Sequence, residues 1–401
     1  MDKPYEKKIY FGMAVDPIHV GTGGYTLGRV DNPTLRDFDG VPKIPGTSIE
    51  GVCRTYEHFR GLGRNKACSK GKKIKEENRE VEPCGNCLIC LAHGFTRDDR
   101  SLQGMALFSD AKILFFPVAS LMGPVWVTCP SRLKELNVDQ DSWQDFDESE
   151  SCVISEHLES KLSDVGYLNF GWLLLQLKKE NDQVVTHNIN SETTFEVNGN
   201  RLKFKDRGFD LEEIFRRLVI VSDSVFSQIV NSNLEVRTSV SIDPTTGAAE
   251  EGALFTYEAI PRTTIFYFDV VYQKPEHFGL SVEVNGRSNL EAIIATVETG
   301  FELFEFLGIG GMGTRGFGKL RIFGLDKNFN RIQLNKIQSE NLLSEIRKLA
   351  EEVEKVKSTE EKEKIQEKIQ KLKEKIRTTM EEYRELVKIW EEACKEVSGC
   401  E

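Results

Sequence analysis

Residues 308–319 read Gly308-Ile309-Gly310-Gly311-Met312-Gly313-Thr314-Arg315-Gly316-Phe317-Gly318-Lys319, a glycine-rich loop that separates two families of nucleotide-binding fold from the alternatives. From Gly313 it nearly matches the phosphate-binding loop G-x-x-x-x-G-K, but Leu320 stands where a Ser or Thr must hold magnesium. A helical pattern precedes the loop and a strand pattern follows it, whereas nucleotide-binding loops run from strand to helix. The order argues against nucleotide hydrolysis and dinucleotide binding. It favours a backbone that approaches a phosphate chain beside Arg315 and Lys319; a structural glycine turn is the alternative.

The segments around this loop predict an α+β fold. One helix follows Pro45-Gly46-Thr47, with Ser or Thr as its N-cap, and another runs from about Asn289 to Phe306. Short runs rich in Val, Ile, Phe and Tyr, bounded by Gly, Pro or Asp, read as strands. These runs are Ile9–Val15, Met105–Phe108, Lys112–Phe116, Val125–Thr128, Thr263–Val271 and Gly318–Phe323. We therefore expect helices packed on one face of an antiparallel sheet.

Composition excludes several classes of protein. The chain has 401 residues, a formal net charge of −11 and 39% hydrophobic residues, which fits a globular chain with a core. The longest apolar run, Ile113–Val127, contains two prolines and is too short to span a membrane. The N-terminus lacks the apolar region of a secretory signal, so we expect a cytoplasmic protein without a membrane partner.

Nine cysteines are unevenly placed, and four of them are crowded between residues 68 and 90. The spacing Cys68-x15-Cys84-x2-Cys87-x2-Cys90 allows thiolates to converge on one tetrahedral ion. The polar segment Asn65–Pro83 cannot fold by apolar burial, so a metal would supply its ordering energy. The spacing predicts structural Zn²⁺; His93 continues the three-residue period and could replace one cysteine, and free thiols are the alternative.

The tail differs in composition from the body. Neither Gly nor Pro occurs from Leu325 to Ser398, and apolar residues recur at spacings of three and four over residues 342–356 and again over residues 365–390. This pattern predicts a C-terminal α-helical hairpin over residues 336–401, following a body of residues 1–335. Its apolar stripes must bury against each other, the body or a partner.

Several stretches of the body carry a resemblance to a known family. They are His19-Val20-Gly21-Thr22-Gly23, Ile44-Pro45-Gly46-Thr47-Ser48-Ile49-Glu50-Gly51, Asp110–Leu114 with Phe116–Val118, Trp126–Pro130, Gly252–Glu258 and the glycine-rich loop. Together they closely resemble the ridge-forming backbone subunit of type III CRISPR effector complexes, in the repeat-associated mysterious protein (RAMP) superfamily. The resemblance spans about residues 8–324. It is closest to the type III-B subunit, whereas a cysteine cluster after the first helix is more familiar in III-A, III-D and III-E relatives, so the subtype stays open.

The resemblance implies a modified ferredoxin-like domain, similar to an RNA-recognition motif, with a zinc-binding insertion at residues 61–93. It also implies a β-hairpin thumb at about residues 231–256, for which Glu235–Ala249 is the best candidate. Copies of such a subunit form a helical filament on a guide crRNA, together with other CRISPR effector subunits. The implied activity is that of an endoribonuclease, which cleaves complementary target RNA at regular intervals by 2′-hydroxyl attack with Mg²⁺ or Mn²⁺. Guide-RNA binding without cleavage, and a structural assembly factor that works through the tail, are the alternatives.

The catalytic aspartate of the family lies between the two N-terminal motifs, where this chain has Asp31. Taken alone, Asp31-Asn32-Pro33 is typical of a turn. By resemblance Asp31 is the catalytic candidate, His19 and Asp37 are supporting candidates, and Asp39 is near enough to share the task. An acidic body needs local basic patches to hold RNA. The RNA-binding candidates are Lys43, Ser48, Arg54, Arg237, Gly310, Gly311, Arg315 and Lys319.

Overall fold

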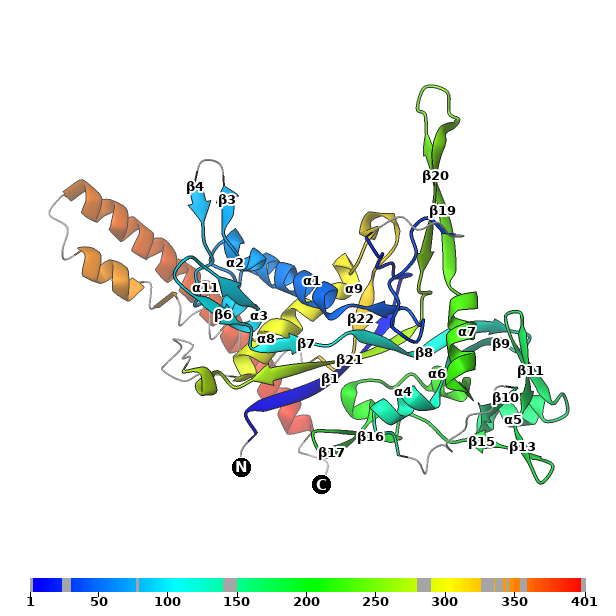
Figure 1. Cartoon of the computed structure of the whole chain (residues 1–401). Coiled ribbons are helices and arrows are strands. Elements are labelled where there is room, and N and C mark those ends of the chain that lie inside the picture. The colour runs from blue at the N-terminus through cyan, green and yellow to red at the C-terminus, as the bar shows by residue number, and fades with distance from the viewer. Residues whose placement is uncertain are drawn as a thin grey trace.

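The structure is a computed structural model, shown in Figure 1. It describes residues 3–23, 30–76, 79–139, 150–279 and 290–325, and in the tail residues 335, 342–343, 346–353 and 359–397. A broad sheet runs through the body, and a long two-stranded hairpin projects from it.

Four antiparallel strands form one end of the sheet in the order β22, β1, β21, β8. They are β1 (Tyr5–Ala14), β8 (Ala111–Ser120), β21 (Ile265–Gln273) and β22 (Leu320–Ile322). Helix α1 (Gly46–Phe59) lies between β1 and β8 in the chain, and α8 (Leu290–Phe301) lies between β21 and β22. This order of strands and helices is that of a ferredoxin-like fold. The α+β class is confirmed.

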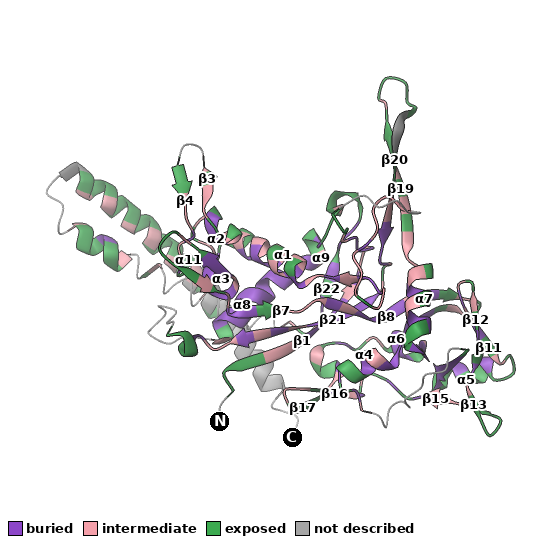
Figure 2. Ribbon diagram, in the orientation of Figure 1, coloured by how far each residue is buried: buried purple, intermediate pink, exposed green. Residues whose placement is uncertain are grey.

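Alternating side chains of β1 are buried on opposite faces of this sheet. Tyr10 faces α1 and α8, and its ring lies 5.1 Å from that of Phe301. Phe11 faces a second core, where the rings of Phe195 and Phe209 lie 5.4 and 5.6 Å away. Figure 2 shows α8 coloured as buried along most of its length. The helices α1 and α8 therefore pack on one face, as expected, and residues 195–215 supply a second apolar layer on the other face.

The sheet continues beyond β8 through strands of mixed direction. The additional strands, in spatial order, are β9 (Gly123–Thr128), β18 (Leu218–Val221), β10 (Ser151–Ser155), β12 (Leu173–Leu177) and β11 (Tyr167–Phe170). The pairs β9/β18 and β10/β12 are parallel, so the sheet as a whole is mixed and not antiparallel. Shorter strands pair at its margins: β2 (Lys43–Ile44) with β8, β7 (Ala106–Phe108) with β21, and β15 (Thr186–His187) with β10.

Short helices and hairpins cover the remaining surface. The helices are α4 (Pro130–Glu135), α5 (Glu156–Leu162), α6 (Glu212–Arg216), α7 (Asp223–Ser232) and α9 (Phe304–Leu307), with 3-10 turns at Phe204–Arg207, Pro275–Phe278 and Gly313–Arg315. The small hairpins are β13 (Lys179–Glu180) with β14 (Gln183–Val184), and β16 (Thr194–Val197) with β17 (Asn200–Lys203).

The projecting hairpin consists of β19 (Glu235–Ile242) and β20 (Ala249–Ala259). Its strands pair from Glu235 opposite Ala259 to Ile242 opposite Ala249. At the tip, the Asp243 carboxylate accepts hydrogen bonds from the Thr245 amide and hydroxyl at 2.8 and 2.6 Å. The hairpin predicted from the sequence is therefore present, and its base lies against the loop that carries Asp31.

An insertion follows α1. It contains α2 (Lys66–Lys70), β3 (Ile74–Glu76), β4 (Arg79–Val81), α3 (Leu88–His93), β5 (Gly94–Thr96) and β6 (Ser101–Gln103). Its small core contains the four clustered cysteines with Leu62, Ile89 and Phe95, and it packs against Ala292 of α8.

In the tail, residues 346–353 are helical and α11 spans Thr359–Val397. Ile365, Ile369, Leu372 and Ile376 are half-buried, as the apolar stripe requires. The turn of the predicted helical hairpin lies outside the described residues. Among the residues that are described, no helix is long and apolar enough to cross a membrane.

Candidate functional site

Asp31 lies at the base of the projecting hairpin, where Thr256 of β20 holds it. The Asp31 carboxylate accepts hydrogen bonds from the Thr256 amide and hydroxyl, both at 2.8 Å, and the Asp31 amide donates to the same hydroxyl oxygen at 2.9 Å. These bonds hold the pKa of the Asp31 carboxyl below its usual value. Asp31 is therefore an ionised, oriented carboxylate that solvent reaches.

His19 lies between the hairpin base and the glycine-rich loop. Its Nδ1 is 2.6 Å from the carbonyl oxygen of Glu258, and its ring meets the Tyr257 ring edge-on at 5.7 Å. The His19 carbonyl accepts a hydrogen bond from the Gly311 amide at 2.9 Å. His19 is buried, so its packing links three segments that are distant in the chain.

Glu258 fastens the Asp31 loop to the hairpin, and sequence reasoning missed this role. Its carboxylate accepts from the Thr34 amide and hydroxyl at 3.0 and 3.1 Å and pairs with Arg36 Nη2 at 2.8 Å. Burial alone would raise the pKa of Glu258, but Arg36 and Thr34 hold it below the usual value. The carboxylate is therefore a charged anchor for residues 34–36.

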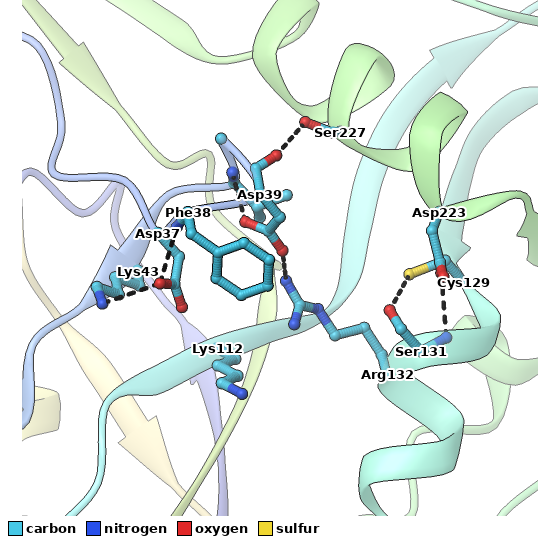
Figure 3. Close-up of polar contacts among 12 residues, drawn as sticks. Asp37, Phe38, Asp39, Lys43, Lys112, Cys129, Ser131, Arg132, Asp223 and Ser227 are labelled. Atoms are coloured by element: carbon cyan, nitrogen blue, oxygen red, sulfur yellow. Dashed lines mark hydrogen bonds and ion pairs between the residues drawn. The ribbon is translucent and has the colours of Figure 1, made fainter.

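Asp37 and Asp39 are engaged in ion pairs further along the loop (Figure 3). Asp37 Oδ1 lies 3.3 Å from Lys43 Nζ, and Asp39 Oδ2 lies 2.6 Å from Arg132 Nη2. Burial would raise the pKa of Asp37, but the Phe38 amide and Lys43 lower it. Both aspartates fix the turn that carries the exposed ring of Phe38.

Lys43 and Ser48 lie at the entrance to α1. Lys43 Nζ also pairs with Asp110 Oδ2 at 2.7 Å, so two carboxylates share its charge. Asp110 Oδ1 accepts from the Gly46 amide at 2.8 Å, and the N-cap of α1 is Pro45 without a side-chain cap. The predicted Ser or Thr cap was therefore wrong: the carboxylate of Asp110, which directly precedes β8, satisfies the free amide. Ser48 is half-buried in the first turn.

The glycine-rich loop folds back on the segment that leads to His19. Gly318 donates to the Pro17 carbonyl at 2.8 Å, and Ile309 donates to the Gly318 carbonyl at 2.9 Å. Gly310, Gly311 and Arg315 are exposed. Arg237 of β19 places its guanidinium 4.7 Å from the Phe317 ring centre, so the loop also contacts the hairpin. Lys319 Nζ lies 3.3 Å from Asp16 Oδ2.

We expect Gly310→Ala to destabilise the body by about 2 kcal/mol or more. Gly310 has φ +82°, and a Cβ there would lie 2.4 Å from the His19 carbonyl oxygen. Gly313→Ala is the matched control, because the added Cβ would meet only the Leu307 carbonyl at 3.9 Å. Urea unfolding measures both variants; equal stability would contradict the tight contact with His19.

Arg54 has a different environment from the other RNA-binding candidates. It is buried, and its guanidinium donates to the carbonyl oxygens of Cys68 at 2.8 and 2.9 Å and of Gly94 at 2.7 Å. The side chain therefore joins α1 to the cysteine-rich insertion, which leaves it poorly placed to meet RNA.

The four clustered cysteines converge on one point. The sulfur atoms of Cys68, Cys84, Cys87 and Cys90 all lie within 4.8 Å of one another, and those of Cys84 and Cys90 are 4.0 Å apart. Thiolates on a tetrahedral zinc with bonds of about 2.3 Å are separated by about 3.8 Å. The four thiols can therefore hold a metal ion, and the donor set fits structural zinc.

His93 does not join these cysteines. Its Nδ1 lies 2.9 Å from Glu50 Oε1 and its Nε2 lies 2.8 Å from Glu57 Oε1, within the layer between α1 and α3. Burial would lower the pKa of His93, but the two carboxylates raise it to about 9. The alternative in which His93 replaces a cysteine ligand is therefore not supported by its position.

The ferredoxin-like core, the glycine-rich loop and the hairpin at the Asp31 loop define the class of this protein. A family model described as the RAMP superfamily matches residues 13–321, which is most of the chain. The chain belongs to the RAMP superfamily.

Two proteins of CRISPR systems are similar to it in sequence. The CRISPR system Cmr endoribonuclease Cmr4 of Pyrococcus furiosus is 28% identical over 287 residues, which cover 68% of this chain and 85% of that protein. The CRISPR system CMR subunit Cmr4 of Saccharolobus solfataricus is 20% identical over 276 residues, covering 65% and 82%.

Solved structures of Cmr assemblies also contain similar chains. A cryo-EM structure of Type III-B Cmr-beta bound to cognate target RNA gives a TM-score of 0.49 at 17% identity, and its apo state gives 0.48 at 18%; each comparison covers 80% of this chain and 98% of that chain. A crystal structure of Cmr4 gives 0.45 at 20% identity, covering 80% and 100%.

Proposed function

We propose that this chain is the backbone subunit of a type III-B CRISPR effector and an endoribonuclease. Several copies bind one guide crRNA as a helical filament, beside other effector subunits, and cleave complementary target RNA at regular intervals through Asp31. The observation that carries this proposal is the oriented Asp31 carboxylate at the base of a projecting hairpin. The similarity to the Cmr4 endoribonuclease supports it.

In this proposal the hairpin β19–β20 is the thumb that crosses the guide–target duplex. A nucleotide displaced at its base would present its 2′-hydroxyl in line with the adjacent phosphate, next to Asp31. The lowered pKa of Asp31 makes its carboxylate a weak proton acceptor and a good ligand for a hard cation. We therefore propose that Asp31 holds the Mg²⁺ or Mn²⁺ ion, which would stabilise the negative charge that develops in the cleavage step. We assign structural positioning roles to His19, Asp37 and Asp39, because protein partners hold each of these side chains in place.

The guide backbone would meet the glycine-rich loop. The exposed backbone at Gly310 and Gly311 has no Cβ atoms to keep a phosphate chain away, and Arg315 and Lys319 supply charge beside it. Arg237 extends this surface onto the hairpin, and Ser48 and Lys43 extend it to the start of α1. Arg54 does not belong to this surface, because its side chain is buried.

Structural Zn²⁺ at Cys68, Cys84, Cys87 and Cys90 is the second part of the proposal. Four thiolates leave no open position for water, so this ion has a folding role and no catalytic one. It would fix the insertion against α8, and thereby the helix that precedes the glycine-rich loop.

One observation favours a second candidate, a non-cleaving guide-RNA scaffold. The Asp31 carboxylate already accepts two hydrogen bonds from Thr256, as a purely structural turn residue would. Asp31→Ala distinguishes the two candidates: a cleaving subunit loses cleavage and keeps RNA affinity, whereas a scaffold is indifferent to the change.

Thr256→Val tests how Asp31 is positioned. The variant keeps the shape and the amide donor but removes the hydroxyl bond to the carboxylate, which is worth roughly 1.5 to 3 kcal/mol for a charged acceptor. We expect target cleavage to fall about 10- to 100-fold with unchanged RNA affinity. Thr238→Val, directly opposite on β19, is the matched control. Equal single-turnover rates for the two variants would contradict the positioning role.

A further inference from the structure

A second group of metal-ligating side chains lies beside the four cysteines. Cys53 and Glu57 are one turn apart on α1, and His93 ends α3, the helix that also carries Cys90. The ligand atoms of these three residues lie within 4.8 Å of one another, and all three side chains are buried. Thiolate, carboxylate and imidazole are the donors that proteins use for zinc.

The histidine is held as metal-bound histidines are held. Its Nε2 faces Glu57, and its other ring nitrogen contacts the Glu50 carboxylate at 2.9 Å. A carboxylate on the far nitrogen fixes the orientation of a ligating imidazole and raises its basicity. Glu50 is itself 3.7 Å from Arg54, so the outer carboxylate keeps its charge.

A hydrogen-bonded histidine alone does not account for the whole group. Glu57 Oε2 is fully buried and has no hydrogen-bond partner among the residues that the structure describes. Leaving a buried carboxylate oxygen unsatisfied costs stability. Cys53 Sγ and His93 Nε2 lie 3.3 and 2.8 Å from Glu57 Oε1, so a thiol, an imidazole and a carboxylate oxygen meet at one buried point, and the second oxygen of that carboxylate is unsatisfied.

We infer that Cys53, Glu57 and His93 form a second metal site, for a zinc-like divalent cation, with Glu57 Oε2 available for further coordination. Binding of a dication replaces the proton of the Cys53 thiol, and the thiolate and the Glu57 carboxylate together balance the charge of the ion. This inference does not depend on RNA binding or cleavage, but the expected count of two ions also rests on the proposed zinc at the four cysteines.

Metal content of the full chain tests the inference. We expect the chain, purified with zinc and dialysed against a weak chelator, to retain two zinc ions per molecule by elemental analysis, one for each group. Cys53→Ala and His93→Gln should each reduce this ratio to one. Cys129→Ala is the matched control, because its buried thiol belongs to neither group.

X-ray absorption at the zinc edge gives a reading that does not depend on the variants. The account predicts a mixture of sulfur and nitrogen or oxygen ligands in the unaltered chain. One zinc per chain, or a spectrum of sulfur ligands alone, would overturn the second site even if both variants fail to fold. Two zinc ions retained by folded Cys53→Ala and His93→Gln would overturn it as well.

Discussion

Asp31→Asn is expected to reduce target cleavage by about 10²- to 10⁴-fold, because the cation that Asp31 holds in this account supplies several kcal/mol of charge stabilisation to the transition state. Asparagine is isosteric and its side-chain oxygen can still accept from the Thr256 amide, so the loop should keep its place on β20. The negative charge is lost, however, and with it the affinity for a divalent cation. The measurement is the single-turnover cleavage rate of a saturating complementary RNA at fixed Mg²⁺.

Asp37→Asn is the matched control for this variant. Asp37 lies in the same loop, but its carboxylate pairs with Lys43 and not with the hairpin base. We expect its cleavage rate to stay within about threefold of the unaltered chain, since Lys43 keeps its ion pair with Asp110 and the loss of one partly solvated pair costs little. A large loss in Asp37→Asn together with full activity in Asp31→Asn would move the active site along the loop.

Cys90→Ser is expected to unfold the insertion and to lower the stability of the body around it. Structural zinc contributes about 10 to 16 kcal/mol to folding of small zinc domains, which is comparable to the whole stability of a typical domain. Cys90 is buried in the small core that packs against α8, so unfolding of the insertion should also destabilise α8. Zinc content and thermal unfolding of the full chain measure both consequences.

Cys129→Ser controls for the replacement of a buried thiol. Cys129 lies outside the cysteine cluster, and its sulfur is 3.4 Å from the Ser131 hydroxyl, a partner that serine can keep. This variant should retain its zinc and unfold near the temperature of the unaltered chain. If Cys90→Ser behaves in the same way, the cluster holds no ion that matters for folding.

The sequence was sufficient to predict most of the ferredoxin-like core. Its strands are apolar runs bounded by Gly, Pro or Asp, and its two main helices carry clear apolar faces, so local pattern and tertiary packing agree. The strand order could also be expected from family resemblance. The mixed extension of the sheet could not be predicted. Strands of four or five residues such as β18 and β10 are buried along their whole length, so their sequences show no alternation that indicates how they pair.

The candidate site was predictable only in part. The position of Asp31 between two motifs pointed to it, but its partner Thr256 lies 225 residues away, and no local spacing indicates such a contact. Arg54 and His93 looked available for RNA or for zinc because charge and spacing suggested it. Folding buried both side chains between α1 and the insertion, where backbone carbonyls satisfy Arg54 and His93 meets Glu50 and Glu57 instead of joining the four cysteines.

The pattern of cleavage along a target RNA tests the central claim most directly. An end-labelled RNA complementary to the guide is incubated with the guide-loaded assembly and Mg²⁺, and product lengths are compared between the unaltered chain and Asp31→Asn. The account predicts products at one regular spacing, one for each copy of the chain, which disappear in the variant while the RNA stays bound. Intact RNA with the unaltered chain, or regular products that persist in Asp31→Asn, would contradict it.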